Sequence, residues 1–356
     1  MRLLMKILPL IFISFSLSCA ATLAKPLATE PSPVEVPRAP GANQAASRGD
    51  GFDAELNGFD YPFPVKTFKF ESQGENVSMA YMDIEPSVNP NGKTVLLFHG
   101  KNFGGFYFDR IAKDLAAKGY RVVIPDQIGF GKSSKPEHYQ YSFAQLARST
   151  HDLLESIGVR EFTLVGHSMG GMLATRYALL YPDSVQKFIL INPIGLEDYR
   201  MLTSYKTIDE QFQNEFKANE ETIKKYQNES YYDGKWKPAY DALIVPAVGW
   251  TKGPDRQRLA YTAALTSDMV YNQPVVHEFK NIKAKTVLII GQRDRTAVGK
   301  GWASPENQKK MGDYPKLGRA AAKAIPKSKL IELPGLGHVP FVEDYDRFAA
   351  VFFKEF

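Results

Sequence analysis

The sequence predicts an α/β protein with a doubly wound, mostly parallel sheet and one helical insertion. Short apolar runs typical of buried strands alternate with amphipathic helical segments, which is the pattern of a parallel sheet covered on both faces. The alternation stops at Gly195 and resumes after Lys283. The residues between contain no clear apolar strand, so we expect them to form a helical cap over the sheet.

The composition is that of a globular protein. The chain has 356 residues, of which 44% are hydrophobic and 23% charged, enough for one large α/β domain or two smaller ones. The formal charge of +5 (44 basic minus 39 acidic residues) is too small and too dispersed to indicate a nucleic-acid partner. The single cysteine, Cys19, excludes a disulfide framework within the chain and a cysteine-built zinc site.

Residues 1–24 have the pattern of a secretory signal peptide. Arg2 and Lys6 form a basic end, and residues 7–17 form an apolar run that is too short to span a bilayer comfortably. Small residues suited to cleavage follow, at Ser18-Cys19-Ala20 and Thr22-Leu23-Ala24. We therefore expect a periplasmic or secreted protein.

A lipoprotein anchored through Cys19 is the alternative. The residues before this cysteine, Ser16-Leu17-Ser18, fit a lipoprotein signal poorly because the leucine stands one place late. No stable membrane span is expected unless the protein is lipidated at Cys19. Residues 25–58 are rich in Pro, Ala, Glu and Ser without periodicity, which predicts an extended, mobile tether.

The core is predicted in two parts, residues 59–194 and 284–356, on either side of a cap at 195–283. Strands are recognised by short apolar or alternating runs, and helices by caps and glycine stops. The predicted strands are Val65–Phe70, Val77–Ile84, Thr94–Phe98, Arg121–Ile124, Phe162–Val165, Lys187–Ile191, Thr286–Ile290 and Lys329–Leu333. The predicted helices are Phe106–Lys118, Phe143–Ile157, Met172–Tyr181 and Asp346–Phe353, with a further helical stretch at Thr207–Gln227 in the cap.

The segment Gly166-His167-Ser168-Met169-Gly170 lies between a predicted strand and a predicted helix. In that context G-x-S-x-G is a nucleophile elbow. The serine must occupy a sharp, strained turn, and the two glycines remove side chains that would clash across it. The N-terminal amides of the following helix favour negative charge at the site. Ser168 is therefore the candidate nucleophile, the alternative being an ordinary serine in a Gly-rich turn.

A serine hydroxyl needs a base, and the base needs a carboxylate to hold and stabilise it. His338 follows the last predicted strand in a Gly-rich loop, and Asp294 follows the strand before it. The order Ser168, Asp294, His338 is the one found with a nucleophile elbow. Asp126 and Asp268 are the alternative acids. Of the other histidines, we expect His167 to point away from Ser168, His99 to belong to a backbone loop, and His138, His151 and His277 to lie at the surface.

A tetrahedral intermediate also needs donors for its oxyanion. One predicted donor is the backbone N–H of Met169, directly after the serine. The other is expected from the loop His99–Gly105, where the Lys101 N–H is favoured and the Asn102 N–H is the alternative.

With these residues in view, the chain resembles the α/β-hydrolase fold superfamily from about Val65 to its C-terminus, in the lidded, serine-nucleophile branch that includes esterases. The residues that carry the resemblance are His99-Gly100, the segment Asp126–Ser133, Gly166–Gly170, Asp294 and Gly337-His338. Many relatives have a proline after the His-Gly pair, where this chain has Lys101-Asn102-Phe103. Ser168 argues against the relatives that use an aspartate nucleophile.

The resemblance implies a hydrolase without cofactor or metal. We expect cleavage of a carboxylic ester through an acyl-enzyme, on a small-molecule substrate with an apolar part. The cap is dense in aromatic residues that either line a pocket for that part or pack the cap. Amide, lactone or carbon–carbon bond hydrolysis by the same residues is the alternative. A non-catalytic binding protein on the same fold is the alternative from a different class.

Overall fold

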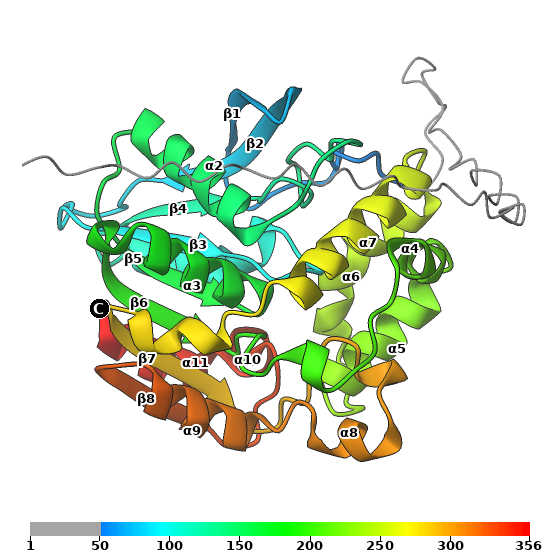
Figure 1. The fold of residues 1–356 in the computed structure, drawn as a ribbon. Helices are drawn as coiled ribbons and strands as arrows, with labels where there is room; N and C mark the ends of the chain where they lie inside the picture. Colours follow the sequence, from blue (N-terminus) through cyan, green and yellow to red (C-terminus); the bar gives the residue numbers. More distant parts are fainter. Residues whose placement is uncertain (1–50) are drawn as a thin grey trace, which may run out of the picture. The chain divides into compact units, whose positions relative to one another are not determined.

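The computed structural model describes residues 51–356. The predicted signal peptide, Cys19 and most of the predicted tether lie outside the described residues. Within them, a single mixed sheet has the strand order β1-β2-β4-β3-β5-β6-β7-β8 (Figure 1). Strand β2 is antiparallel to both of its neighbours, β1 and β4, and β4, β3, β5, β6, β7 and β8 run parallel to one another.

The eight strands agree with the sequence prediction to within a few residues at their ends. Their bounds are β1 Val65–Ser72, β2 Glu75–Ile84, β3 Thr94–Phe98, β4 Arg121–Pro125, β5 Phe162–His167, β6 Val185–Ile191, β7 Lys285–Gly291 and β8 Ser328–Leu333. The central strands β3 to β7 are buried on both faces, which is why they read as continuous apolar runs in the sequence.

Alternate residues of each strand pack into two separate apolar clusters, one on each face of the sheet. On β3, for example, Leu96 belongs to one cluster and Leu97 to the other. The first cluster is completed by α2 (Phe143–Ser156), α3 (Met169–Leu180) and α9 (Tyr314–Ala324), and the second by α1 (Asp109–Ala116) and α11 (Tyr345–Phe352). The sheet is therefore doubly wound, as predicted.

Several helices differ from the prediction. The predicted helix at 106–118 is a 3-10 turn, Gly105–Phe108, followed by α1. Helix α3 begins at Met169, directly after the serine and before the predicted start at Met172. Three helices were not predicted: the short α8 (Pro305–Lys310) and α10 (Pro340–Glu343), and the longer α9. None of the helices in residues 51–356 has both the length and the apolar character that crossing a membrane requires.

Residues 192–284, between β6 and β7, contain helical elements and no strand. These form the cap: α4 (Ile208–Phe216), α5 (Glu220–Tyr231), α6 (Asp241–Lys252) and α7 (Arg256–Asn272), grouped beside the sheet in Figure 1. The helical stretch predicted at 207–227 is two helices. Thr207 caps α4 and Asn219 caps α5, each in a capping box, so that the chain turns between them.

Residues 51–61 correct the predicted domain boundary, because ordered structure begins before residue 59. We call this segment the N-terminal strap. Its Phe52 N–H donates to the carbonyl of Gly249 in α6 (3.1 Å), and the Lys132 ammonium donates to the carbonyl of Leu56 (2.8 Å). Leu56 is fully buried. The strap therefore connects the cap to a loop of the core, an outcome of tertiary packing that composition alone does not indicate.

Gly253→Ala is expected to disrupt the strap, because a Cβ at this position would overlap the carbonyl oxygen of Phe52. Overpacking of this kind costs about 1–3 kcal/mol of unfolding free energy. Thermal unfolding and limited proteolysis within residues 51–61 measure the effect. Gly301→Ala is the matched control, since its Cβ would enter open space. Equal stability and protease resistance of the two variants would contradict the tight contact.

Candidate active site

Ser168 lies between β5 and α3 with φ 55° and ψ −123°, a backbone conformation that few non-glycine residues adopt. The flanking glycines explain how the turn is accommodated. A Cβ on Gly166 would overlap the carbonyl oxygen of Gly170, and one on Gly170 would overlap that of Phe98. The strained turn holds the Ser168 hydroxyl at the carboxyl end of the sheet, where the residue is 6% exposed.

The structure brings Ser168, His338 and Asp294 together. The Nε2 atom of His338 lies 2.9 Å from the Ser168 Oγ, and its Nδ1 lies 2.7 Å from an Asp294 carboxylate oxygen. His338 and Asp294 are fully buried. Because an ionised carboxylate only accepts, these partners assign the hydrogen of a neutral imidazole to Nδ1 and leave Nε2 free to accept from the serine.

Asp294 is held by two further donors besides His338. The Asn192 Nδ2 and the Thr296 N–H each donate to its carboxylate at 2.8 Å. Asn192 is the first residue after β6 and was not predicted as a site residue, although its place at a strand's carboxyl end is where such a residue is expected. These contacts fix the carboxylate in the orientation that the histidine needs.

The alternative acids are engaged elsewhere. Asp126 accepts hydrogen bonds from the Tyr61 hydroxyl and the Gly105 N–H (2.6 Å each). Asp268 accepts from the Tyr205 hydroxyl on the exposed side of the cap (2.9 Å). Neither carboxylate is bonded to His338, so the geometry supports Asp294 over both.

The loop after β3 lies against the serine, since a Cβ on Gly100 would be 3.0 Å from that of Ser168. Two of the amides in this loop already donate within the protein: Gly100 to the Tyr107 hydroxyl (2.9 Å), and Phe103 to the Gly100 carbonyl (3.2 Å). The Lys101 and Asn102 amides between them are the candidates that the sequence proposed. The Met169 amide is at the start of α3, directly after the nucleophile.

His167 connects the loop after β3 to the catalytic histidine candidate. The Gly100 N–H donates to the Tyr107 hydroxyl, which lies 2.7 Å from His167 Nδ1, while His167 Nε2 lies 2.9 Å from the carbonyl oxygen of His338. Nε2 is therefore the donor and Nδ1 the acceptor. Burial lowers the pKa of His167 well below its ordinary value, consistent with this neutral form. His167 supports the site without bonding the serine.

The remaining histidines lie outside the triad. His99 is buried, and its ring nitrogens bond the Gly100 carbonyl (2.9 Å) and the Gln127 N–H (3.0 Å). His138 and His277 are exposed, and His151 is half-buried against Tyr181. His99 thus links two loops of the core. His138 and His277 lie at the surface as expected, whereas the stacking on Tyr181 leaves His151 only partly exposed, which the sequence did not predict.

Glu343 supports the loop that carries His338. One carboxylate oxygen accepts from the Gly337 N–H (2.7 Å), and the other is paired with the Arg293 guanidinium next to Asp294. The side chain of Glu343 is 6% exposed. The pair therefore joins the loop of the acid to the loop of the base. Burial raises the pKa of Glu343 to about 7, against the opposing effect of Arg293.

This raised pKa makes stability depend on pH. The folded protein keeps the Glu343 proton up to about pH 7, whereas the ordinary value in the unfolded chain is 4.5. The group thus favours folding most at low pH, and this contribution is lost as pH rises from 4.5 through about 7. On going from about pH 7.5 to about pH 5.5, the native protein is expected to gain about 2 kcal/mol of unfolding free energy relative to Glu343→Gln.

Urea unfolding of both proteins at the two pH values measures this difference. Glu137→Gln, at an exposed position, is the control and should follow the native protein. Parallel pH dependence of the native protein and Glu343→Gln would rule out the raised pKa.

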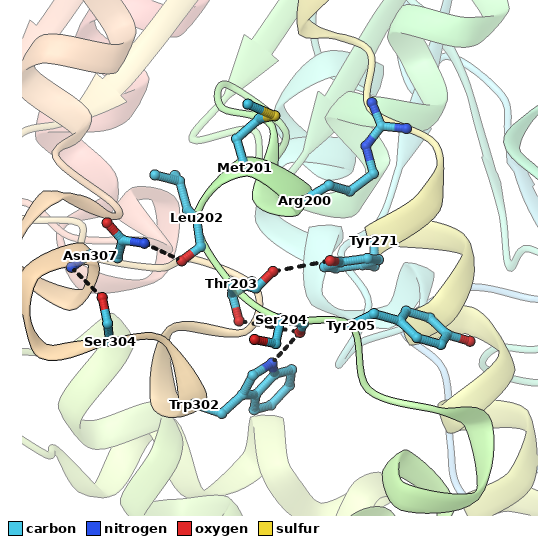
Figure 2. A pocket seen from close by; sticks show the side chains of 10 residues that line it. All are labelled: Arg200, Met201, Leu202, Thr203, Ser204, Tyr205, Tyr271, Trp302, Ser304 and Asn307. Atoms are coloured by element: carbon cyan, nitrogen blue, oxygen red, sulfur yellow. Dashed lines mark hydrogen bonds between the residues drawn. The ribbon is translucent and has the colours of Figure 1, made fainter.

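A surface hollow of about 420 Å³ is lined by residues 200–205, by Tyr271 and by Trp302, Ser304 and Asn307 (Figure 2). Its polar groups are mostly bonded to one another: Trp302 Nε1 donates to the Ser204 carbonyl (3.2 Å), and Asn307 Nδ2 to that of Leu202 (2.7 Å). It contains none of the predicted site residues. Within residues 51–356, no group of three or more His, Cys, Asp or Glu residues is arranged to hold a metal ion.

The doubly wound sheet, the strained serine turn and the Ser168–His338–Asp294 contacts define the class of protein. The chain belongs to the alpha/beta hydrolase fold family, whose model matches residues 93–345.

Individual relatives agree with this family. A crystal structure of a probable hydrolytic enzyme from Pseudomonas aeruginosa is 46% identical, with a TM-score of 0.84, covering 85% of this chain and 97% of the other. Lipase 1 of Psychrobacter immobilis is 29% identical over 73% of this chain and 76% of its own length. Lipase 3 of Moraxella sp. is 28% identical over 72% of this chain and 74% of its own length.

Proposed function

We propose that this protein hydrolyses carboxylic esters through a Ser168–His338–Asp294 triad. The observation that carries the proposal is the continuous set of contacts from the Ser168 hydroxyl through the imidazole to the buried carboxylate. A serine hydroxyl is a weak nucleophile unless a base removes its proton during attack, and this arrangement supplies that base.

The reaction proceeds in two halves. The Ser168 Oγ attacks the ester carbonyl while its proton passes to His338 Nε2, and the backbone amides of Met169 and Lys101 bind the oxyanion. His338 then gives that proton to the leaving alcohol as the C–O bond breaks, which leaves an acyl-enzyme. A water molecule repeats the sequence, losing its proton to His338 and releasing the acid and the free serine. Asp294 holds the imidazole and stabilises its positive charge.

An ester is the favoured substrate because the two curated relatives named above are lipases. The aromatic cap supports a substrate with an apolar part. Tyr226 of α5 is 45% exposed, and its ring packs edge-on against that of Tyr231 with centroids 5.6 Å apart. Lys101 reaches the cap as well, where its ammonium lies 3.4 Å from Glu215 of α4.

A matched series of p-nitrophenyl esters and p-nitroanilides with acyl chains of increasing length tests the bond and the chain preference. We expect turnover of the esters, increasing over the shorter acyl chains of the series, and far slower turnover of the anilides. Preferential cleavage of the anilides, or no turnover of any ester by folded protein, would refute the proposal.

We also propose that the enzyme works outside the cytoplasm, as the N-terminal 24 residues suggest. Cell fractionation followed by N-terminal sequencing of the mature protein tests this. A mature protein that begins before residue 18 in the cytoplasmic fraction would contradict it.

A further inference from the structure

Tyr231, the last residue of α5 in the cap, lies directly on the imidazole of His338. The two rings are stacked, with centroids 4.5 Å apart and planes 26° from parallel. Tyr231 is 3% exposed. Its backbone is also in contact with the same loop, because the His338 N–H donates to the Tyr231 carbonyl (3.4 Å). A Cβ on Gly337 would overlap that carbonyl oxygen, so this close approach requires glycine.

The hydroxyl of Tyr231 reaches a second part of the site. It accepts a hydrogen bond from Asn102 Nδ2 at 2.8 Å. Asn102 follows Lys101 in the loop proposed to bind the oxyanion. One cap side chain thus contacts both the loop of the base and the loop of the oxyanion donors.

A ring from the core also contacts the imidazole. The ring of His167 lies with its centroid 4.9 Å from that of His338, at an interplanar angle of 54°. His338 therefore contacts an aromatic ring from the cap and a ring from the core, while its two nitrogens bond Asp294 and Ser168.

This arrangement suits a base that becomes cationic during the reaction. The face of an aromatic ring attracts a nearby positive charge, and contact between the ring planes limits rotation of the imidazole. Rotation matters because proton transfer needs Nε2 within hydrogen-bond reach of the reacting oxygen. A misplacement of about 1 Å is enough to cost about 100-fold in rate.

We propose that Tyr231 is a positioning residue, so that catalysis depends on the packing of cap helix α5 against the loops of the active site. Its ring holds His338 in the orientation used for proton transfer, and its hydroxyl, through Asn102, sets the loop that supplies an oxyanion donor. The inference rests on the proposed ester hydrolysis and concerns kcat rather than substrate binding.

Tyr231→Leu removes the aromatic face but keeps an apolar side chain. We expect kcat for a p-nitrophenyl ester to fall about 10- to 100-fold with KM changed less than about threefold. Tyr231→Phe keeps the ring and loses only the hydroxyl contacts, so its loss of kcat should be clearly smaller than that of Tyr231→Leu. If the ring served only for packing, Tyr231→Leu would not lower kcat selectively over KM, and Tyr231→Phe would have no higher kcat than Tyr231→Leu.

Asn102→Ala and Tyr231→Phe each remove one partner of the same hydrogen bond. Each is expected to lower kcat about 2- to 5-fold. The double variant should match Tyr231→Phe, because Asn102→Ala has no Tyr231 hydroxyl left to lose once the phenylalanine is in place. Losses that multiply in the double variant would overturn the proposed link to the oxyanion loop.

Tyr240→Leu is the matched control. Tyr240 is a cap tyrosine of similar burial, at 2% exposed, and it stacks on Tyr232 with centroids 3.8 Å apart. It should lose stability but keep kcat within about twofold of the native protein. If Tyr231→Leu does not fold, Tyr231→Met replaces it, since methionine adapts to irregular space.

Native kcat from Tyr231→Leu or its methionine replacement would overturn the positioning role. A loss in Tyr231→Phe as large as that in Tyr231→Leu, or an equal loss of kcat in Tyr240→Leu, would do so as well. Failure of the proposed function is a separate result, because the native protein would then turn over no ester in the same assay.

Discussion

Ser168→Ala is expected to lower kcat for ester hydrolysis by about 10⁴-fold or more, with little change in stability. The hydroxyl is the atom that forms the acyl-enzyme, and alanine leaves neither a nucleophile nor a proton for His338 to accept. The residual rate should come from substrate binding and the oxyanion donors alone. Steady-state kinetics with p-nitrophenyl esters and thermal unfolding measure both quantities.

Ser184→Ala provides the control for this variant. Ser184 precedes β6, at the amino end of the parallel strands and away from the site. It should retain native turnover. Hydrolysis by pure Ser168→Ala at more than a few per cent of the native rate would remove the serine from the mechanism.

Asp294→Asn is expected to lower kcat by about 10⁴-fold while leaving the fold intact. An asparagine amide directed at His338 Nδ1 would donate rather than accept, which moves the imidazole hydrogen to Nε2. That nitrogen then cannot accept the Ser168 proton. The loss should appear in kcat for every ester that the native protein cleaves, because proton transfer from Ser168 to His338 is required whatever the acyl chain.

Asp268→Asn is the matched control, because Asp268 was an alternative acid in the sequence and bonds only cap residues, Tyr205 and Asn272, in the contacts observed. It should have native kcat. The assignment of Asp294 would be wrong if Asp268→Asn lost activity and Asp294→Asn kept it.

Most of the core could be predicted from the sequence because its determinants are local. A strand buried on both faces must be apolar along its whole length, and β3, β5, β6 and β7 satisfy this almost residue for residue. The serine turn is equally local, since its glycines act on neighbours within the same turn. The N-terminal strap was missed because its partners, such as Gly249 and Lys132, are distant in the chain.

The site residues also divide into those with local signals in the sequence and those without. Ser168, Asp294 and His338 each follow a recognisable strand, and the carboxyl ends of parallel strands meet at one edge of the sheet, so their proximity could be inferred. Asn192, Glu343 and Tyr231 act through contacts with segments far away in the sequence. Tyr231 in particular was one of many aromatic residues in the cap, and only the packing of α5 on the histidine loop distinguishes it.

Ser168 acts as a nucleophile activated by its contact with His338 in the proposed mechanism. Labelling of the folded protein with a fluorophosphonate, followed by intact mass measurement and peptide mapping, tests this role most directly. We expect one adduct per chain, on Ser168, and loss of that adduct in Ser168→Ala. An adduct on a different serine, or none on the folded native protein, would contradict it.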